Sequence, residues 1–403
     1  MKKLFLSKRD FILFPLSLVL FEFTVYVAND MIQPVMLTVV MCFNTDINWI
    51  PTSLTSYLAG GVFVQWLFGP LSDIQGRRPI MLFGVFFFSL SCFSILFVSN
   101  IEQFIIMRFI QGIGLCFIGS VGYAVIQEIF NETQCIKIIS LMANVALIAP
   151  LFGPLAGAIL VDIISWKGMF IIFSLLSLIS FVGLYFFMPE TVIVKNKKPL
   201  SFFILWCNYK KVLRNLCFIF GSLSIGFANL PLLSWIALSP IILINGEHLS
   251  IFIYAMLQIP VFGGLLLGNF TLSYLTTKKT LVDLIKFGGK PMILGLIITS
   301  ISVIYLSNIY IFIIIGLSLY AFGLGVSNAC LTRLTLFSSN LSKGIVSAAM
   351  GIIIIIVFIL GIEFSKKMYL FGEENAFNLL NLFSGLCWLF FIKYFLKNLI
   401  NKK

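Results

Sequence analysis

The chain has 403 residues, of which 60% are hydrophobic and only 10% charged, and its formal net charge at pH 7 is +12. So little polar surface excludes a water-soluble globule and indicates an integral membrane protein. The apolar runs are continuous, which favours an all-α protein over the alternating strands of a membrane β-barrel.

Twelve apolar windows are long enough to span a hydrocarbon core about 30 Å thick, which takes roughly 20 helical residues. In chain order the expected transmembrane helices cover about 11 to 37, 50 to 72, 79 to 99, 103 to 127, 138 to 162, 167 to 188, 216 to 242, 251 to 275, 290 to 307, 309 to 333, 345 to 366 and 376 to 397.

The placement of the 27 Lys and Arg residues explains the positive net charge. Most of them fall in alternate loops on the side that holds both termini, whereas the opposite side has essentially Lys167, Lys366 and Lys367. The positive-inside rule therefore places both termini in the cytoplasm. The charge follows membrane orientation, so we expect no nucleic-acid partner.

The chain also divides into two halves. Its most polar long interruption, 189–215, is expected to be a cytoplasmic linker between an N-terminal six-helix half, 1–188, and a C-terminal six-helix half, 216–403. The segments LSDIQGRR at 71–78 and LSYLTTKK at 272–279 align without gaps, about half a chain apart. A six-plus-six parallel repeat is the architecture that both observations favour.

The stretch FEFTVYVAND at 21–30 places two acids inside the first expected span. On a regular helix Glu22, Tyr26, Asn29, Asp30 and Gln33 fall within an arc of about 100°. An ionisable group in a membrane span is costly and marks a pathway or relay for charge. The alternative is a pair of charges that only fixes helix packing.

Arg108 in the fourth expected span is the candidate partner for Asp30. The two spans run in opposite directions, and both residues fall roughly 10 Å to the outer side of the membrane centre. We therefore expect Arg108 to hold Asp30 in its ionised form. Glu22 lies near the midplane and has no opposite charge at its own depth.

Three further motifs admit a functional or a purely structural interpretation. In the fifth span, Pro150 and Pro154 interrupt the helix while Gly153 and Gly157 allow close packing, which predicts either a moving element or a packing kink. The turn GPLSDIQGRRP at 69–79 is either an ion-pair latch between helix ends or a topogenic loop. In the eighth span, Tyr254 and Gln258 lie one turn apart. They are interpreted either as ligand contacts or as polar residues that pack between helices.

The eight cysteines are scattered and the single His248 stands apart from them, so we expect no metal, disulfide or cofactor. No clustered Asp motif or Ser/His pair suggests a membrane-embedded enzyme.

These motifs, in this order, resemble the twelve-span drug:H⁺ antiporters of the major facilitator superfamily. The stretch Gly69–Arg78 is similar to G-x-L-S-D-x-x-G-R-R, Arg108–Gly114 to R-x-x-Q-G-x-G, and Ala149–Gly157 to the antiporter motif of the fifth span. One departure is Ile74, where a basic residue is usual, and it weakens the expected cytoplasmic latch.

The resemblance implies a monomeric multidrug exporter of a bacterial inner membrane, which exchanges protons for lipophilic cations and neutral drugs by alternating access. The proton-coupling residues would be Glu22, Asp30 and Arg108. The substrate-binding residues would be Tyr26, Asn29, Asp30, Met142, Ala146, Leu232, Tyr254 and Gln258. The conformational motifs would comprise Gly69, Asp73, Gly76, Arg77, Arg78, Pro150, Gly153, Pro154 and Gly157. A proton-coupled metabolite symporter of the same fold is the alternative.

Overall fold

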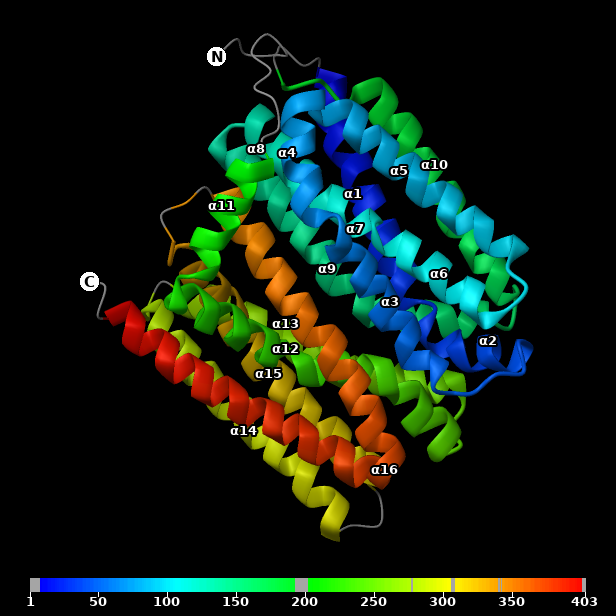
Figure 1. Cartoon of the computed structure of the whole chain (residues 1–403). Coiled ribbons are helices and arrows are strands. Elements are labelled where there is room, and N and C mark those ends of the chain that lie inside the picture. The colour runs from blue at the N-terminus through cyan, green and yellow to red at the C-terminus, as the bar shows by residue number, and fades with distance from the viewer. Residues whose placement is uncertain are drawn as a thin grey trace. The chain divides into compact units, whose positions relative to one another are not determined.

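The computed structural model describes residues 8–192, 202–276, 278–305, 309–339, 341 and 343–400. These residues form helices and connecting segments without a β-strand, as expected for an all-α protein. The chain divides into two compact units, Met1–Phe202 and Phe203–Lys403. We describe each unit by itself (Figure 1).

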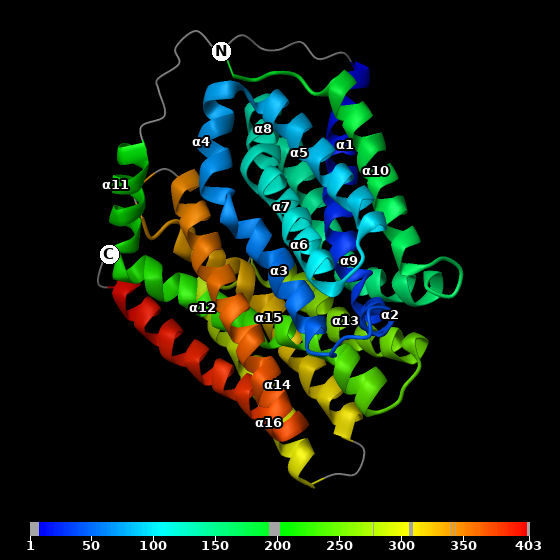
Figure 2. The ribbon, with the colours of Figure 1, turned by 45° about the vertical axis from the view of Figure 1, so that its right-hand side comes forward.

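The first unit holds the helices up to α10. They are α1 (Lys8–Asp30), η1 (Gln33–Val35), α2 (Met36–Cys42), α3 (Trp49–Phe63), α4 (Gln65–Gln75), α5 (Arg77–Ser94), η2 (Ile95–Phe97), α6 (Ile101–Gly112), α7 (Gly114–Phe117), the π-helix η3 (Ile118–Gly122), α8 (Tyr123–Ile129), α9 (Glu132–Leu160) and α10 (Trp166–Phe187). Helix α10 packs against both α1 and α5, and α9 packs against α1 (Figure 2).

The second unit begins within α11 (Phe202–Leu213), a helix that occupies part of the predicted linker. Its other helices are α12 (Leu216–Ser239), the π-helix η5 (Pro240–Gly246), α13 (Ile251–Leu275), α14 (Leu281–Tyr305), α15 (Ile309–Leu336) and α16 (Lys343–Ile400). Helix α15 packs against α13 and α14, and α12 packs against α16. Residues 193–201 of the predicted linker lie outside the described part of the chain.

Eight helices of the described chain are long and apolar enough to cross a membrane, or nine if the bent helix α9 is counted. The count differs from the twelve predicted spans because some spans are divided or joined in the structure. The second predicted span is divided between α3 and α4, and the described part of the ninth lies within α14. The last two form the two arms of α16, which turns back at the non-helical residues Gly372 and Glu373 (Figure 2).

Helix starts and breaks follow from local sequence. Asn131 and Gln134 form a reciprocal capping box at the start of α9, and the Ser250 hydroxyl caps α13. Pro150 cannot donate to the carbonyl of Ala146, and α9 bends by 41° between the segments that end at Ala146 and begin at Ile148. The bend therefore has its cause in the span-five motif.

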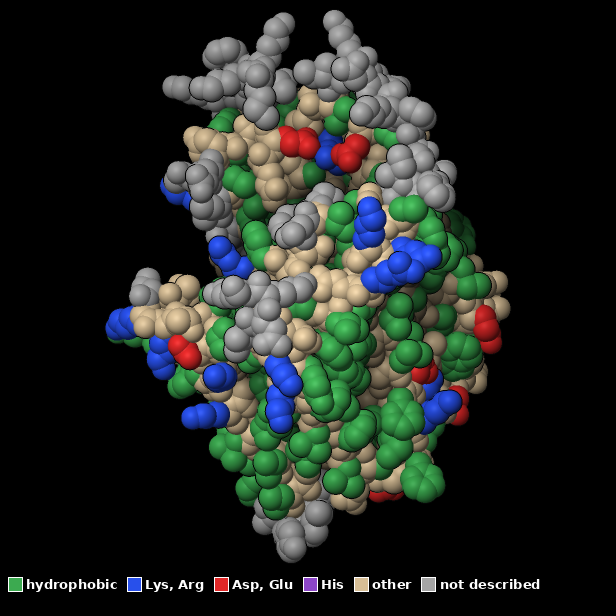
Figure 3. All heavy atoms as spheres, turned by 60° about the vertical axis from the view of Figure 1, so that its left-hand side comes forward, with side chains coloured by type: hydrophobic (Ala, Val, Ile, Leu, Met, Phe, Trp, Pro, Cys, Tyr) green, Lys and Arg blue, Asp and Glu red, His purple; other side chains and the backbone are tan. Residues whose placement is uncertain are grey.

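Many large apolar side chains lie on the outside of the protein. Phe371 is 89% exposed, Ile163 71% and Phe270 70%. Figure 3 shows broad areas of hydrophobic side chains on one face, with Lys and Arg gathered in groups. Such a surface suits hydrocarbon and not water.

Candidate functional site

The polar residues predicted to share one face of the first span lie on α1, except for the last of them. Glu22 is fully buried and Asp30 is 5% exposed, while Tyr26 and Asn29 are half-buried. Helix α1 ends at Asp30, and Gln33 belongs to the separate short helix η1, so the stripe is interrupted before its last member. The Gln33 side-chain amide donates to the Asn29 carbonyl at 3.1 Å across this interruption.

Arg108 of α6 reaches Asp30 through a neighbouring amide. Its Nη2 donates to Asn29 Oδ1 at 2.9 Å, and Asn29 Nδ2 donates to Asp30 Oδ1 at 3.0 Å. The ion pairs among the described residues do not include one between Arg108 and Asp30. The comparison of depths in the membrane thus selected two helices that are in contact. The two charged groups are connected through the Asn29 amide, which bonds to both of them.

The remaining contacts of Arg108 are neutral. Its Nη1 donates to Gln111 Oε1 at 3.0 Å and to the Ala28 carbonyl at 3.3 Å, and its Nε donates to Ser53 Oγ at 3.2 Å. The Tyr57 ring lies 4.5 Å from the guanidinium carbon. A buried cation with this many acceptors and an aromatic face is held in one position. Sequence analysis did not identify Ser53 or Tyr57, whose helix could not be placed beside α6 from depth alone.

Glu22 has a different environment. The Tyr123 hydroxyl donates to Glu22 Oε1 at 3.1 Å, whereas Oε2 has no hydrogen-bonding partner among the described residues. Tyr123 directly follows the π-helix Ile118–Gly122, which turns later residues away from their regular α-helical directions. A wheel drawn for a regular helix therefore could not predict this contact.

The span-five motif packs against the end of α1 that carries Asp30. A Cβ atom on Gly153 would lie 2.9 Å from Asp30 Cβ, and one on Gly157 would lie 2.1 Å from the Met31 carbonyl oxygen. Pro154 lies between these glycines in α9. The motif is therefore a direct packing partner of the acidic site, which the sequence alone did not reveal.

Two predicted substrate contacts also lie on α9. Met142 is buried and Ala146 is half-buried, and both precede the bend at Pro150. Their part in binding a substrate stays a prediction.

The segment GPLSDIQGRRP at 69–79 contains the turn that joins α4 and α5. Arg77 forms ion pairs with Asp73 of α4 and, at 2.9 Å, with Glu128 of α8. Arg77 is only 9% exposed, so the cluster is partly sheltered from water. Gly69 of the same motif faces Ser120 of η3, and an added Cβ would meet it at an ordinary 4.0 Å.

A further acid, which the sequence analysis did not identify, stabilises the turn between α4 and α5. Glu190 accepts hydrogen bonds from the backbone N–H groups of Arg77 at 2.9 Å and Arg78 at 3.2 Å. These are free donors at the start of α5, where a carboxylate is favourable. Gly76 has φ +110°, a conformation that favours glycine, and an added Cβ would lie 2.5 Å from the Glu190 carboxylate.

In the second unit the structure brings two predicted residues into one polar cluster. Trp235 Nε1 of α12 donates to Gln258 Oε1 of α13 at 2.9 Å, and the Ser239 hydroxyl donates to the Tyr254 hydroxyl oxygen at 3.3 Å. Tyr254 and Gln258 are each 1% exposed, and Leu232 is 6% exposed one turn before Trp235. Sequence analysis missed Trp235, although a tryptophan N–H within an apolar span signals a buried partner.

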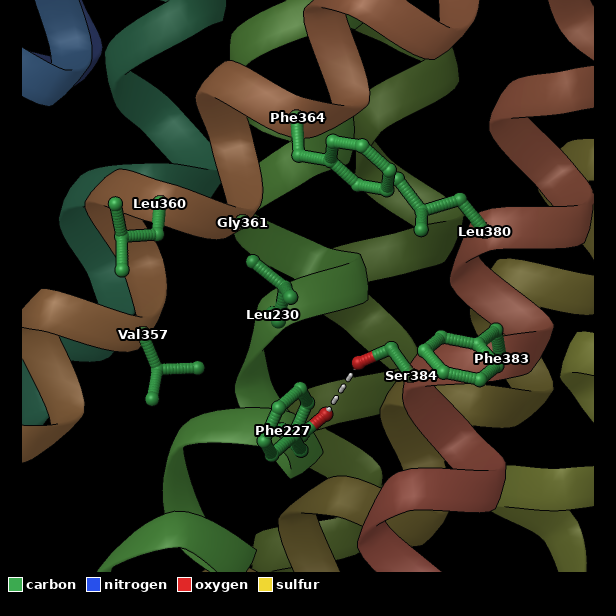
Figure 4. A pocket seen from close by; sticks show the side chains of 9 residues that line it. All are labelled: Phe227, Leu230, Val357, Leu360, Gly361, Phe364, Leu380, Phe383 and Ser384. Atoms are coloured by element: carbon green, nitrogen blue, oxygen red, sulfur yellow. Dashed lines mark hydrogen bonds between the residues drawn. The ribbon is translucent and has the colours of Figure 1, made fainter.

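A separate apolar cavity of about 290 Å³ lies between α12 and the two arms of α16 (Figure 4). It is lined by Phe227, Leu230, Val357, Leu360, Gly361, Phe364, Leu380, Phe383 and Ser384. The Ser384 hydroxyl donates to the Phe227 carbonyl at 3.0 Å, which leaves no free polar group in the lining. The cavity contains none of the predicted substrate contacts.

Comparison with known proteins shows the family of the chain. The chain matches the Major Facilitator Superfamily over residues 18–365. It is 59% identical over 389 residues to the multidrug transporter MdfA of Yersinia pestis, covering 96% of this chain and 95% of the relative. It is 54% identical over 390 residues to the multidrug transporter MdfA of Escherichia coli, covering 97% and 95%.

Solved structures share the fold at low sequence identity. The xylose transporter XylE from E. coli has a TM-score of 0.73 at 17% identity, covering 96% of this chain and 98% of that one. The nucleoside transporter NupG has a TM-score of 0.70 at 13% identity, covering 95% and 99%. The match over most of the sequence, the all-helical fold and the motifs of α4, α6 and α9 together establish that the chain belongs to the Major Facilitator Superfamily.

Proposed function

We propose that this protein is a proton-coupled antiporter that exports lipophilic cationic and neutral drugs by alternating access. The names of the relatives that are 54–59% identical support multidrug transport. The observation that carries the proton-coupled part is the fully buried Glu22, which has a carboxylate oxygen without a hydrogen-bonding partner among the described residues. Such an oxygen is available to a proton or to a cationic ligand.

Competition between these two ligands would supply the coupling. An ionised carboxylate in an apolar surrounding attracts a lipophilic cation strongly, because little solvent screens it, whereas a protonated one does not. Binding of the cation and binding of the proton then oppose each other, and this reciprocal effect is the requirement for exchange.

Asp30 would serve as the second carboxylate of the exchange. Its connection through Asn29 to the buried Arg108 gives it a positively charged neighbour without a closed ion pair. A proton or a substrate at Asp30 would change the contacts of Asn29 and, through them, the position of Arg108 between α1, α3 and α6. We assign proton coupling to Glu22, Asp30 and Arg108.

The other substrate contacts would give shape and hydrogen bonding. In the first unit we assign Tyr26, Asn29, Asp30, Met142 and Ala146 to this role. In the second unit we assign Leu232, Tyr254 and Gln258. A mostly apolar surface with a few polar groups suits ligands that share size and lipophilicity more than a fixed pattern of substituents.

Two motifs would govern the conformational change. The Asp73–Arg77–Glu128 cluster would stabilise one arrangement of the helix ends, with Gly76 and Arg78 in the turn, and the ring-locked Pro150 and Pro154 would let α9 bend. Gly153 packs on Asp30 and Gly157 on Met31, so a change at the acid would alter the packing of α9.

We place the protein in a bacterial inner membrane as a monomer with both termini in the cytoplasm. Its partners would be protons, drugs and lipids, without a cofactor, a metal, a nucleic acid or an enzymatic step. The charge pattern of the loops supports this orientation.

Uptake of a fluorescent lipophilic cation into energised inverted vesicles tests the proposal, with a chloramphenicol resistance assay beside it. We expect proton-driven accumulation of the cation and increased resistance. Failure with both compounds would contradict multidrug export. Movement of substrate and proton in the same direction would favour the alternative, a metabolite symporter.

A further inference from the structure

The amide of Gln258 has one satisfied end and one unsatisfied end. Its Oε1 accepts the hydrogen bond from Trp235 Nε1 at 2.9 Å. Its Nε2 is buried and has no hydrogen-bonding partner within the described part of the chain. Both side chains are almost fully enclosed, with Trp235 0% and Gln258 1% exposed.

The indole ring determines which end of the amide is which. A glutamine amide can rotate so that its oxygen and nitrogen exchange places, but an indole N–H is only a donor. The indole N–H of Trp235 can therefore bond to the amide only when Oε1 of Gln258 faces it. The two N–H groups of Gln258 are then left to point elsewhere, and they can pair only with an acceptor.

A buried donor without an acceptor is unfavourable, and proteins rarely leave one in place without a role for it. The remaining polar groups of this cluster do not fill that role. Ser239 donates to Tyr254, and Gln258 Nε2 has no bond with either. The missing acceptor is therefore one that the described residues do not supply in this conformation.

We infer that Trp235 is a positioning residue that fixes the Gln258 amide as a hydrogen-bond donor for ligands that carry an acceptor oxygen, such as a carbonyl, hydroxyl or nitro group. This inference rests on the proposed function, because it defines the ligand chemistry of the same substrate site. Since Gln258 is enclosed in the present structure, a ligand reaches its amide when neighbouring side chains move apart during the transport cycle.

The arrangement separates two classes of drug. A neutral drug that has acceptor oxygens gains the Gln258 hydrogen bond, whereas a lipophilic cation that has no oxygen or nitrogen does not. Sites that offer a buried hydrogen-bonding group discriminate strongly against ligands that leave it unpaired. Gln258 thus favours the neutral class, and the acids of the first unit favour the cationic class.

Equilibrium binding to the purified full-length protein tests the inference, with chloramphenicol as the acceptor-bearing probe and tetraphenylphosphonium as the probe without an acceptor. We expect Gln258→Met to lower chloramphenicol affinity on the order of tenfold more than it lowers tetraphenylphosphonium affinity. Met256→Leu, at a 46% exposed position on the same helix, is the matched control and leaves both affinities unchanged.

A double-mutant cycle separates positioning from packing. Trp235→Phe keeps an aromatic ring but removes the N–H donor. We expect it to lower chloramphenicol affinity roughly fivefold in the native background and to have no further effect in the Gln258→Met background. Equal losses in both backgrounds would mean that Trp235 acts by packing alone and would overturn the inference.

The outcomes also distinguish this inference from the proposed function. If the native protein binds both probes but Gln258→Met changes their affinities by the same factor, the inference is wrong while multidrug binding stands. If the native protein binds neither probe, both are overturned. If Trp235→Phe does not fold, the affinity ratio of Gln258→Met alone decides the inference.

Discussion

The Arg108 guanidinium donates to the side-chain oxygen of Asn29 at 2.9 Å. The same Asn29 amide donates through its nitrogen to the Asp30 carboxylate at 3.0 Å. One neutral side chain therefore connects a fully buried cation to a buried acid. It does so with both ends of its amide, so that a change at either charge disturbs the other.

Removal of this connection should impair coupled transport. Asn29→Ala deletes two hydrogen bonds to charged groups, one from Arg108 and one to Asp30, and a bond of this kind contributes roughly 1.5–3 kcal/mol. We expect proton-driven export of a lipophilic cation to fall at least about tenfold. Substrate-induced proton release by the purified protein measures the effect directly. Thr24→Val is the matched control, since among the described residues the Thr24 hydroxyl bonds only to the Leu20 carbonyl of its own helix. Equal transport by Asn29→Ala and the control would contradict a role for Asn29.

Neutralisation of Glu22 should separate the two drug classes. Glu22→Gln keeps the size of the side chain and removes its negative charge. Because the acid is fully buried, little solvent screens its attraction for a cation. We expect cation export to fall at least about tenfold, with a smaller effect on chloramphenicol export. Parallel transport assays in vesicles measure both. Equal losses for the two drugs would show that Glu22 does not discriminate by charge.

Close packing of α9 on α1 should depend on a glycine. Gly157→Ala would put a Cβ 2.1 Å from the carbonyl oxygen of Met31, the residue that follows α1, so α9 must move away from this end of α1. Overpacking of this kind costs about 1–3 kcal/mol, and we expect the Tm in detergent to fall by several degrees.

The control for this experiment is a glycine in open space. Gly263 of α13 has no atom within 4 Å of an added Cβ, so Gly263→Ala should leave the Tm unchanged or raise it slightly. If the two substitutions had the same effect on the Tm, close packing at Gly157 would not be important.

The charge cluster of Asp73, Arg77 and Glu128 should bias the conformational equilibrium. Arg77→Ala removes both ion pairs, to Asp73 and to Glu128, from a position that is only 9% exposed. Arg77→Lys keeps the charge but loses the second guanidinium nitrogen, which donates to the Ser72 hydroxyl. We expect the equilibrium to shift several-fold for Arg77→Ala and less for Arg77→Lys. Distances between paired spin labels within the first unit, on α4 and α8, measure the shift. Lys211→Ala, at an exposed site, should have no effect, and an unchanged distance distribution in Arg77→Ala would contradict a latch.

Composition and helical periodicity were sufficient for the fold class and for the polar face that carries Glu22, Tyr26, Asn29 and Asp30. Both depend on local sequence, namely on apolar length and on a repeat of 3.6 residues. Depth matching also selected Arg108. It could not predict that Asn29 would stand between Arg108 and Asp30, because that depends on how α1 rotates against α6.

The missed residues share one physical cause. Tyr123 reaches Glu22 after a π-helical segment, and Glu190 reaches the turn at Gly76 from more than 100 residues away along the chain. Each contact depends on an irregular helix or on a distant element, which a regular helical wheel does not contain. The division between α3 and α4 interrupts the second predicted span, whereas the turn inside α16 falls in the gap predicted between the last two spans.

Simultaneous recording of proton flux and of lipophilic-cation flux in proteoliposomes is the most direct test of the central claim. With an imposed cation gradient and no proton gradient, the account predicts proton movement opposite to the cation in the native protein. It also predicts that Glu22→Gln combined with Asp30→Asn abolishes this proton movement. Protons that move with the cation, or coupled flux that persists in the double variant, would contradict proton–drug exchange through these two acids.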